Sequence, residues 1–287
     1  MEHRVPVADG ISLSARIHSP QTGARGLAVV AHPYGFVGGT QDDPVVQQLV
    51  HYFLHVQRVH VVTYNQRGVK ASGGRVTWTM RRECDDYQAV VDAMLQHLRA
   101  DARDAGAPTV FLCVRARAVR LTAGVQCGGD AVRARNDALT SSAATAVARP
   151  APDSPWAAAT TRHVLIAYPV GVAWLLTCLR AAHMQQALDA RVRAACAPPH
   201  APSHAVLCVW MTQDQFTSPA TYEKWCAALR AVGASADGAG RGGQGAHPGA
   251  PTRCAAALRT ASLRGDHFLA APAQRAGLER ILHVCQP

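Results

Sequence analysis

The chain has 287 residues, of which 48% are hydrophobic and 17% charged, and its formal net charge is +10. This length and balance allow a sizeable core and predict a single α/β domain over residues 1–287. All but two of the 29 basic residues are arginines spread along the whole chain, with no basic run that alternates with aromatics, which argues against a nucleic-acid partner.

The nine cysteines are scattered and contain no C-x-x-C pair, so they indicate neither a disulfide framework nor a zinc site. The first residues, MEHRVPVADGISLS, carry no apolar segment of the kind that directs secretion. The longest apolar run, residues 164–179, is shorter than the roughly 20 residues that cross a bilayer and contains Pro169 and Gly171. We therefore expect a cytoplasmic protein without a membrane span.

Short apolar runs bounded by turn residues predict buried parallel strands. The runs are residues 26–32, 59–65, 109–114, 163–168 and 204–211, and a weaker one covers 254–263.

Amphipathic segments between these runs predict helices. In the segment 42–54, Asp43 is a suitable N-cap with Pro44 at the first helical position, and its apolar residues share one face. Further helices are expected over residues 81–100, 221–232 and 273–284. Alternating strands and helices predict a doubly wound, mostly parallel sheet.

Two segments interrupt this alternation. Residues 115–155 are rich in Ala, Arg, Ser and Thr without a period, and residues 233–252 are of low complexity. Loops of this length are uncommon inside a compact domain, so each segment is predicted to be either disordered or an irregular insertion.

Five motifs occur in a characteristic order: VVAHPYGFVGGTQDDPVV from residue 29, VVTYNQRGVKASGG from 61, LIAYPVGVAWLLT from 165, TQDQFTS from 212 and LRGDHF from 263. Their order and approximate spacing, over roughly two thirds of the chain, resemble those of the α/β-hydrolase superfamily, most closely its small serine-hydrolase branch with a His-Pro-x-Gly loop. The resemblance implies an α/β-hydrolase fold with a sheet of about eight strands, and hydrolysis of an ester or related acyl substrate.

Asp214 and His267 each follow the end of a predicted strand. A hydrolase of this kind needs an acid that orients a histidine, and both should lie on loops at the carboxyl edge of the sheet. We therefore predict that Asp214 and His267 form the acid and base of a catalytic site.

The loop HPYGFVGG is rich in glycine, as expected where backbone N–H groups face a developing oxyanion and unusual dihedrals are needed. The resemblance assigns an oxyanion donor to Tyr34 or Gly35. It also implies that Arg67 and Gly68, in NQRG, form a structural turn. Asp85 and Asp86, near the start of the helix expected at 81–100, are explained by the helix dipole.

The expected nucleophile position holds no nucleophile. Such enzymes place a serine in G-x-S-x-G directly after a central strand, but here residues 109–114 are followed by Arg-Ala-Arg-Ala-Val. Three explanations stay open. Ser142, in TSSAATA, has Thr140 and Ala144 where the two glycines would stand and follows the strand directly if the intervening residues are an insertion. Cys127, in VQCGGD, is a second candidate, and a chain without any nucleophile is the third.

The sequence thus predicts an esterase-like serine hydrolase with Ser142, Asp214 and His267 as its catalytic residues and a small acyl substrate as its partner. The mechanism needs neither a cofactor nor a metal. His51 and His55 lie one helical turn apart but lack a third ligand, so they predict a solvated helix face instead of a metal site. The alternative is a catalytically inactive protein of the same fold that binds a ligand or a protein in the same cleft.

Overall fold

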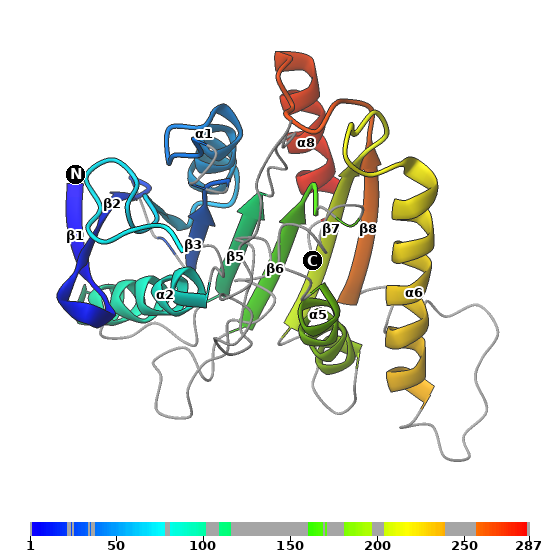
Figure 1. Ribbon diagram of the computed structural model, residues 1–287, viewed down its shortest axis with the longest axis horizontal. Helices are drawn as coiled ribbons and strands as arrows, with labels where there is room; N and C mark the ends of the chain where they lie inside the picture. The colour runs from blue at the N-terminus through cyan, green and yellow to red at the C-terminus, as the bar shows by residue number, and fades with distance from the viewer. Residues whose placement is uncertain are drawn as a thin grey trace, which may run out of the picture.

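The computed structural model shows a central sheet with helices on both faces (Figure 1). It describes residues 2–21, 24, 26–33, 35, 38–77, 81–101, 109–115, 160–168, 170, 181–196, 204–238 and 257–285. The sheet has eight strands in the order β1-β2-β4-β3-β5-β6-β7-β8. The strands are β1 (Glu2–Pro6), β2 (Ser12–His18), β3 (Gly26–Ala31), β4 (His60–Tyr64), β5 (Thr109–Arg115), β6 (Thr160–Ile166), β7 (His204–Met211) and β8 (Leu258–Leu263). The prediction of a mostly parallel sheet of about eight strands is confirmed.

Only the first two strands run antiparallel to their neighbours: β1 pairs with β2, and β2 pairs with β4. From β4 to β8 every pairing in the sheet is parallel. The six strands of this parallel part are those predicted from apolar runs. Buried parallel strands read as such runs because both of their faces are covered.

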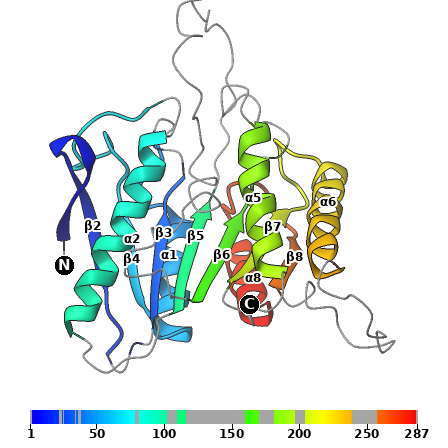
Figure 2. The same cartoon turned by 90° about the horizontal axis from the view of Figure 1, so that it is seen from below.

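Within the described residues, five helices cover the sheet: α1 (Pro44–His51), α2 (Arg81–Asp101), α5 (Ala181–Cys196), α6 (Pro219–Gly238) and α8 (Pro272–Val284). In the view from below, α2 and α5 lie on one side of the strands and α1 and α8 on the other (Figure 2). Two apolar clusters correspond to these layers. One joins the sheet to α2, α5 and α6, and the other joins it to α1, α8 and the short helical turn η3 (Tyr52–Val56).

The start of α1 follows the prediction. The Asp43 side chain accepts a hydrogen bond of 2.9 Å from the backbone N–H of Val45, and Pro44 is the first helical residue. The expected apolar face, Val46, Leu49, Val50 and Phe53, is buried.

Three features of the fold differ from the sequence-based expectation. The hairpin of β1 and β2 and the helix α5 were not predicted, because β1 is largely exposed and α5 is rich in alanine and arginine, so neither shows a clear apolar pattern. Helix α6 continues to Gly238, so the prediction of an irregular segment from residue 233 is wrong for residues 233–238. The remainder of that segment to residue 252, and the segment 116–155, lie outside the described residues.

None of the helices that the structure describes combines the length and the apolar character needed to cross a bilayer.

Candidate active site

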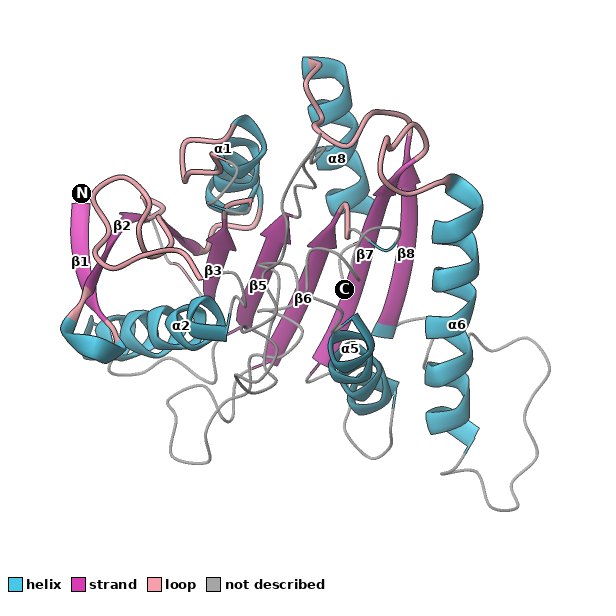
Figure 3. Ribbon diagram, viewed as in Figure 1, coloured by secondary structure: helices cyan, strands magenta, loops and turns pink. Residues whose placement is uncertain are grey.

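The loops that follow β7 and β8 lie beside each other at the carboxyl edge of the sheet (Figure 3). Two backbone hydrogen bonds of 2.9 Å join them, from Thr212 N–H to the Leu263 carbonyl and from Gln213 N–H to the Gly265 carbonyl. These bonds extend the β7–β8 pairing past the strand ends. They hold together residues that are 51 and 52 positions apart in the sequence.

Asp214 is oriented by its own loop. Its Oδ1 oxygen accepts hydrogen bonds from the backbone N–H groups of Phe216, at 2.7 Å, and Thr217, at 3.1 Å. An aspartate that bonds to the backbone two and three residues ahead forms a local turn. Because this turn uses Oδ1, the second oxygen, Oδ2, faces the loop that follows β8.

His267 lies against that oxygen. The distance from its Nδ1 to Asp214 Oδ2 is 2.7 Å, and both side chains are fully buried. The backbone N–H of His267 donates to the side-chain oxygen of Gln215 at 3.2 Å. The rings of Phe216 and Phe268 meet the imidazole edge-on, with centroids 4.9 and 5.7 Å away. The imidazole is therefore held in one orientation from several sides.

The electrostatics of the pair identify which nitrogen carries the proton. Burial by itself raises the pKa of Asp214, but the hydrogen bond and charge of His267, the Phe216 amide and the Tyr222 hydroxyl outweigh it and leave that pKa below its usual value. Asp214 is then an acceptor only, so His267 Nδ1 must be the donor. In the neutral ring, Nε2 is the basic nitrogen, as a general base requires.

Tyr222, in the first turn of α6, is a third member of this group that the sequence did not reveal. Its hydroxyl donates to Asp214 Oδ2 at 3.0 Å. A tyrosine in the helix directly after a predicted catalytic aspartate was the available signal. Periodicity alone assigns such a residue to the core, where its ring indeed lies.

The predicted oxyanion loop is attached to the turn after β4. His32 is fully buried, its Nε2 accepts from Gln66 N–H at 2.9 Å, and its Nδ1 contacts the Pro33 carbonyl. Burial lowers the pKa of His32 to about 4, so the ring is neutral and donates from Nδ1. The Gly35 N–H donates to Gln66 Oε1 at 3.2 Å. Tyr34 lies outside the described residues.

The reason for glycine at position 35 differs from the expected one. Gly35 is not among the residues with positive φ, so unusual dihedrals do not explain it. A Cβ there would lie 2.5 Å from Val69 Cγ2. The close approach of the loop to the turn after β4 is what requires glycine.

The predicted nucleophiles are not placed. Strand β5 lies between β3 and β6 in the middle of the sheet and ends at Arg115. Ser142 and Cys127 both lie outside the described residues.

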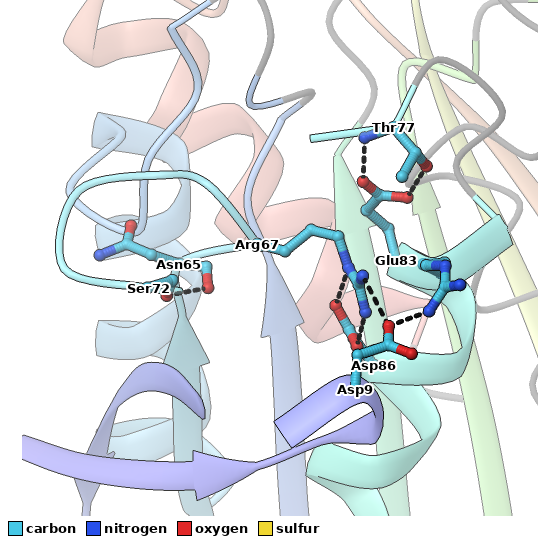
Figure 4. Close-up of polar contacts among 8 residues, drawn as sticks. Asp9, Asn65, Arg67, Ser72, Thr77, Glu83 and Asp86 are labelled. Carbon is cyan, nitrogen blue, oxygen red and sulfur yellow. Dashed lines mark hydrogen bonds and ion pairs between the residues drawn. The ribbon is translucent and has the colours of Figure 1, made fainter. Parts of the chain in front are cut away.

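A second polar cluster follows β4 (Figure 4). Arg67 forms two hydrogen bonds with Asp86 of α2, Nε to Oδ2 at 2.8 Å and the terminal nitrogen to Oδ1 at 2.6 Å. Their side chains are 5% and 1% exposed. The helix-dipole explanation of Asp86 is therefore wrong: this carboxylate is buried and holds the turn that contains Arg67 against α2.

The backbone of this turn requires glycine at position 68. Its φ is +71°, and a Cβ would lie 2.7 Å from the backbone nitrogen of Val76. The structural turn expected for Arg67 and Gly68 is the one observed. The residues that the structure describes contain no group of three or more His, Cys, Asp or Glu side chains suited to a metal ion.

The sheet order, the helical layers and the position of Asp214 and His267 at its carboxyl edge define an α/β-hydrolase fold. No protein-family model and no curated protein matches the sequence.

Solved structures do match it. An α/β serine hydrolase homologue from Coxiella burnetii superposes with a TM-score of 0.57 at 13% identity, covering 98% of this chain and 95% of that chain. An α/β serine hydrolase without a lid from Xanthomonas campestris gives 0.56 at 14% identity, over 99% and 92% of the two chains. An esterase from Pyrococcus furiosus gives 0.58 at 8% identity, over 100% and 91%. At these identities the similarity establishes the fold.

Proposed function

We propose that the protein is an esterase-like serine hydrolase that acts on an ester or related acyl substrate. The observation that carries this proposal is the buried hydrogen bond between Asp214 and His267. It joins an ionised acid to the histidine nitrogen opposite the one that must accept a proton. The names of the structural neighbours, which are serine hydrolases and an esterase, agree with this chemistry.

In the proposed reaction His267 Nε2 takes the hydroxyl proton of Ser142, and the serine oxygen attacks the acyl carbon. The carbonyl π electrons move to the carbonyl oxygen, which becomes an oxyanion. When they return, the bond to the leaving alcohol breaks, and the imidazolium gives its proton to that alcohol. Water then repeats the sequence on the acyl-enzyme, which releases the acid and restores Ser142. Asp214 stabilises the imidazolium in both halves.

Backbone N–H groups at Tyr34 and Gly35 are the proposed oxyanion donors. The Gly35 N–H already donates to Gln66, so its use would require the Gln66 side chain to move. This favours Tyr34 as the main donor. The proposed chemistry requires no cofactor. We place the protein in the cytoplasm, and none of its described cysteines forms a disulfide.

One observation favours an alternative function. The residues that follow the central strand β5 are Ala116, Arg117, Ala118 and Val119, none of which can attack a carbonyl. In this alternative the protein binds a small molecule or a protein partner and catalyses nothing.

A fluorophosphonate probe, which reacts with an activated serine, tests the proposal. We expect labelling of the purified wild-type protein and a loss of about 10³-fold in labelling rate in Ser142→Ala and in His267→Ala. Cys127→Ser and His55→Ala are matched controls and should label at the wild-type rate. Labelling by iodoacetamide that is lost only in Cys127→Ser, in a protein that the fluorophosphonate does not label, would identify the cysteine as the nucleophile. Absence of labelling by both probes in a protein shown to be folded would support the binding function.

A further inference from the structure

We infer that Tyr222 is a positioning residue, whose hydroxyl shares one oxygen of Asp214 with His267 and thereby limits how strongly the imidazole holds its proton. The effect of the Tyr222 hydroxyl on turnover rests on the proposed function. Its effect on the Asp214–His267 pair is independent of that function, because it requires only the contacts described below.

The geometry provides the first argument. Asp214 Oδ2 accepts from His267 Nδ1 at 2.7 Å and from the Tyr222 hydroxyl at 3.0 Å. The Thr217 hydroxyl in turn bonds to the phenol oxygen of Tyr222. Because Oδ1 is occupied by the two backbone N–H groups of its turn, the Asp214 carboxylate receives four hydrogen bonds. Thr217, Tyr222, Asp214 and His267 form a continuous chain of polar contacts.

Packing holds the Tyr222 hydroxyl in place. The Tyr222 side chain is fully buried, and its ring stacks on Trp210 of β7 with centroids 5.3 Å apart and planes inclined by 19°. Its backbone N–H donates to the Ser218 carbonyl at 3.1 Å, and the Ser218 hydroxyl accepts from Thr221 N–H at 3.2 Å, which fixes the first turn of α6. The stack and the fixed turn together orient the phenol hydroxyl toward Asp214 Oδ2.

The charges around the phenol make it a permanent donor. Burial and the adjacent Asp214 carboxylate raise the pKa of Tyr222 above its ordinary value, so the hydroxyl keeps its proton. Among the described residues, the titratable groups that act on Asp214 are His267, from the loop after β8, and Tyr222, from α6. Cys226, one turn further along α6, also faces Tyr222.

A second donor on Oδ2 withdraws charge from the oxygen that stabilises the imidazolium. The carboxylate then attracts the proton of His267 less than it would with the histidine alone. A general base works best when its proton affinity suits neutral pH, since a base that stays protonated cannot accept a proton. The Tyr222 hydroxyl thus lowers the proton affinity of His267 by its hydrogen bond to Asp214.

The experiment compares Tyr222→Phe with wild type by NMR of the histidine ring. Phenylalanine keeps the stack on Trp210 and removes only the hydroxyl. In the variant we expect the pH midpoint of the His267 ring resonances to rise by about 0.5 to 1 pH unit, because one hydrogen bond to the carboxylate is lost. The His267 Nδ1 proton should move further downfield, and its signal is assigned by its absence in His267→Ala.

Tyr87→Phe is the matched control. Its hydroxyl is also buried and donates at 3.0 Å, but to the backbone carbonyl of Val29, so its removal should leave the His267 midpoint unchanged. Thr217→Val keeps the Tyr222 hydroxyl and removes the group behind it. It should move the midpoint in the same direction by less, and it provides the test if Tyr222→Phe does not fold.

A folded Tyr222→Phe protein with an unchanged His267 midpoint would overturn the inference, even if the fluorophosphonate probe labels the enzyme. A raised midpoint in a protein that the probe never labels would support the inference and reject the hydrolase function. A raised midpoint together with labelling supports both, and the pH profile of labelling should then move upward in the variant by the same amount.

Discussion

Two buried pairs, each joining an aspartate carboxylate to a basic side chain, lie at the carboxyl edge of the sheet and differ in their chemistry. Arg67 comes three residues after β4 and pairs with Asp86, and Asp214 comes three residues after β7 and pairs with His267. The arginine uses two nitrogens on both carboxylate oxygens, whereas the histidine uses one nitrogen on one oxygen.

The difference follows from the chemistry of the guanidinium and the imidazole. A guanidinium never loses its proton at ordinary pH and fits a carboxylate with two parallel bonds, so the Arg67 pair holds two segments together permanently. An imidazole can gain and lose a proton, and the single contact leaves its second nitrogen for that role. The Arg67 pair therefore stabilises a turn, whereas the His267 pair is suited to proton transfer, although Arg67 and Asp214 both lie in a polar loop directly after a strand.

The largest expected effect is on the structural pair. Arg67→Met removes one partner and leaves Asp86 buried without its cation, so the free energy of unfolding should fall by about 3 to 5 kcal/mol. Urea unfolding measures it. Arg82→Ala is the control: this half-exposed arginine pairs with Asp9, itself half exposed, and its loss should cost less than about 1 kcal/mol. Equal losses in the two variants would show that burial does not distinguish these pairs.

The turn that carries Arg67 provides the next effect. Gly68→Ala should reduce the free energy of unfolding by about 2 to 4 kcal/mol, because φ is positive and the new Cβ would meet the backbone at Arg75 and Val76. At Gly38, φ is +84° but a Cβ would meet nothing within 4 Å. Gly38→Ala should therefore cost only the conformational part, about 1 kcal/mol, in the same unfolding measurement. A Gly68→Ala protein as stable as Gly38→Ala would contradict the close approach.

The smallest effect concerns the second pair and depends on pH. The folded-state pKa of Asp214 lies below its unfolded value, so its ionised form stabilises the fold above about pH 4, and this contribution is lost as the pH falls through the folded pKa. Asp214→Asn should therefore be less stable than wild type at pH 7, by about 1 to 3 kcal/mol, and the difference should shrink below pH 4. Urea unfolding from pH 7 to pH 3 measures this. The exposed Glu223→Gln on α6 serves as control, and a difference independent of pH would reject the assignment.

Much of the fold could be predicted because its parallel strands are buried on both faces. Continuous apolar runs such as residues 26–32 and 204–211 identify such strands without any knowledge of their neighbours. The position of Asp214 and His267 just past two of these runs was sufficient to expect them at one edge of the sheet. Strand β1 and helix α5 could not be found in this way, because exposure and small side chains weaken the pattern.

The sequence by itself determined the positions of the six parallel strands and the nearness of Asp214 and His267, since these depend on hydrophobic pattern and on the distance from a strand end. Only the tertiary structure decided which residue each of these groups contacts. Asp86 bonds to Arg67, Gly35 packs against Val69 and bonds to Gln66, and Tyr222 bonds to Asp214. The hydrophobic pattern predicts whether a side chain is buried. Which partner a buried polar group bonds to depends on the register of the strands and the packing of the helices, and no local stretch of sequence encodes these.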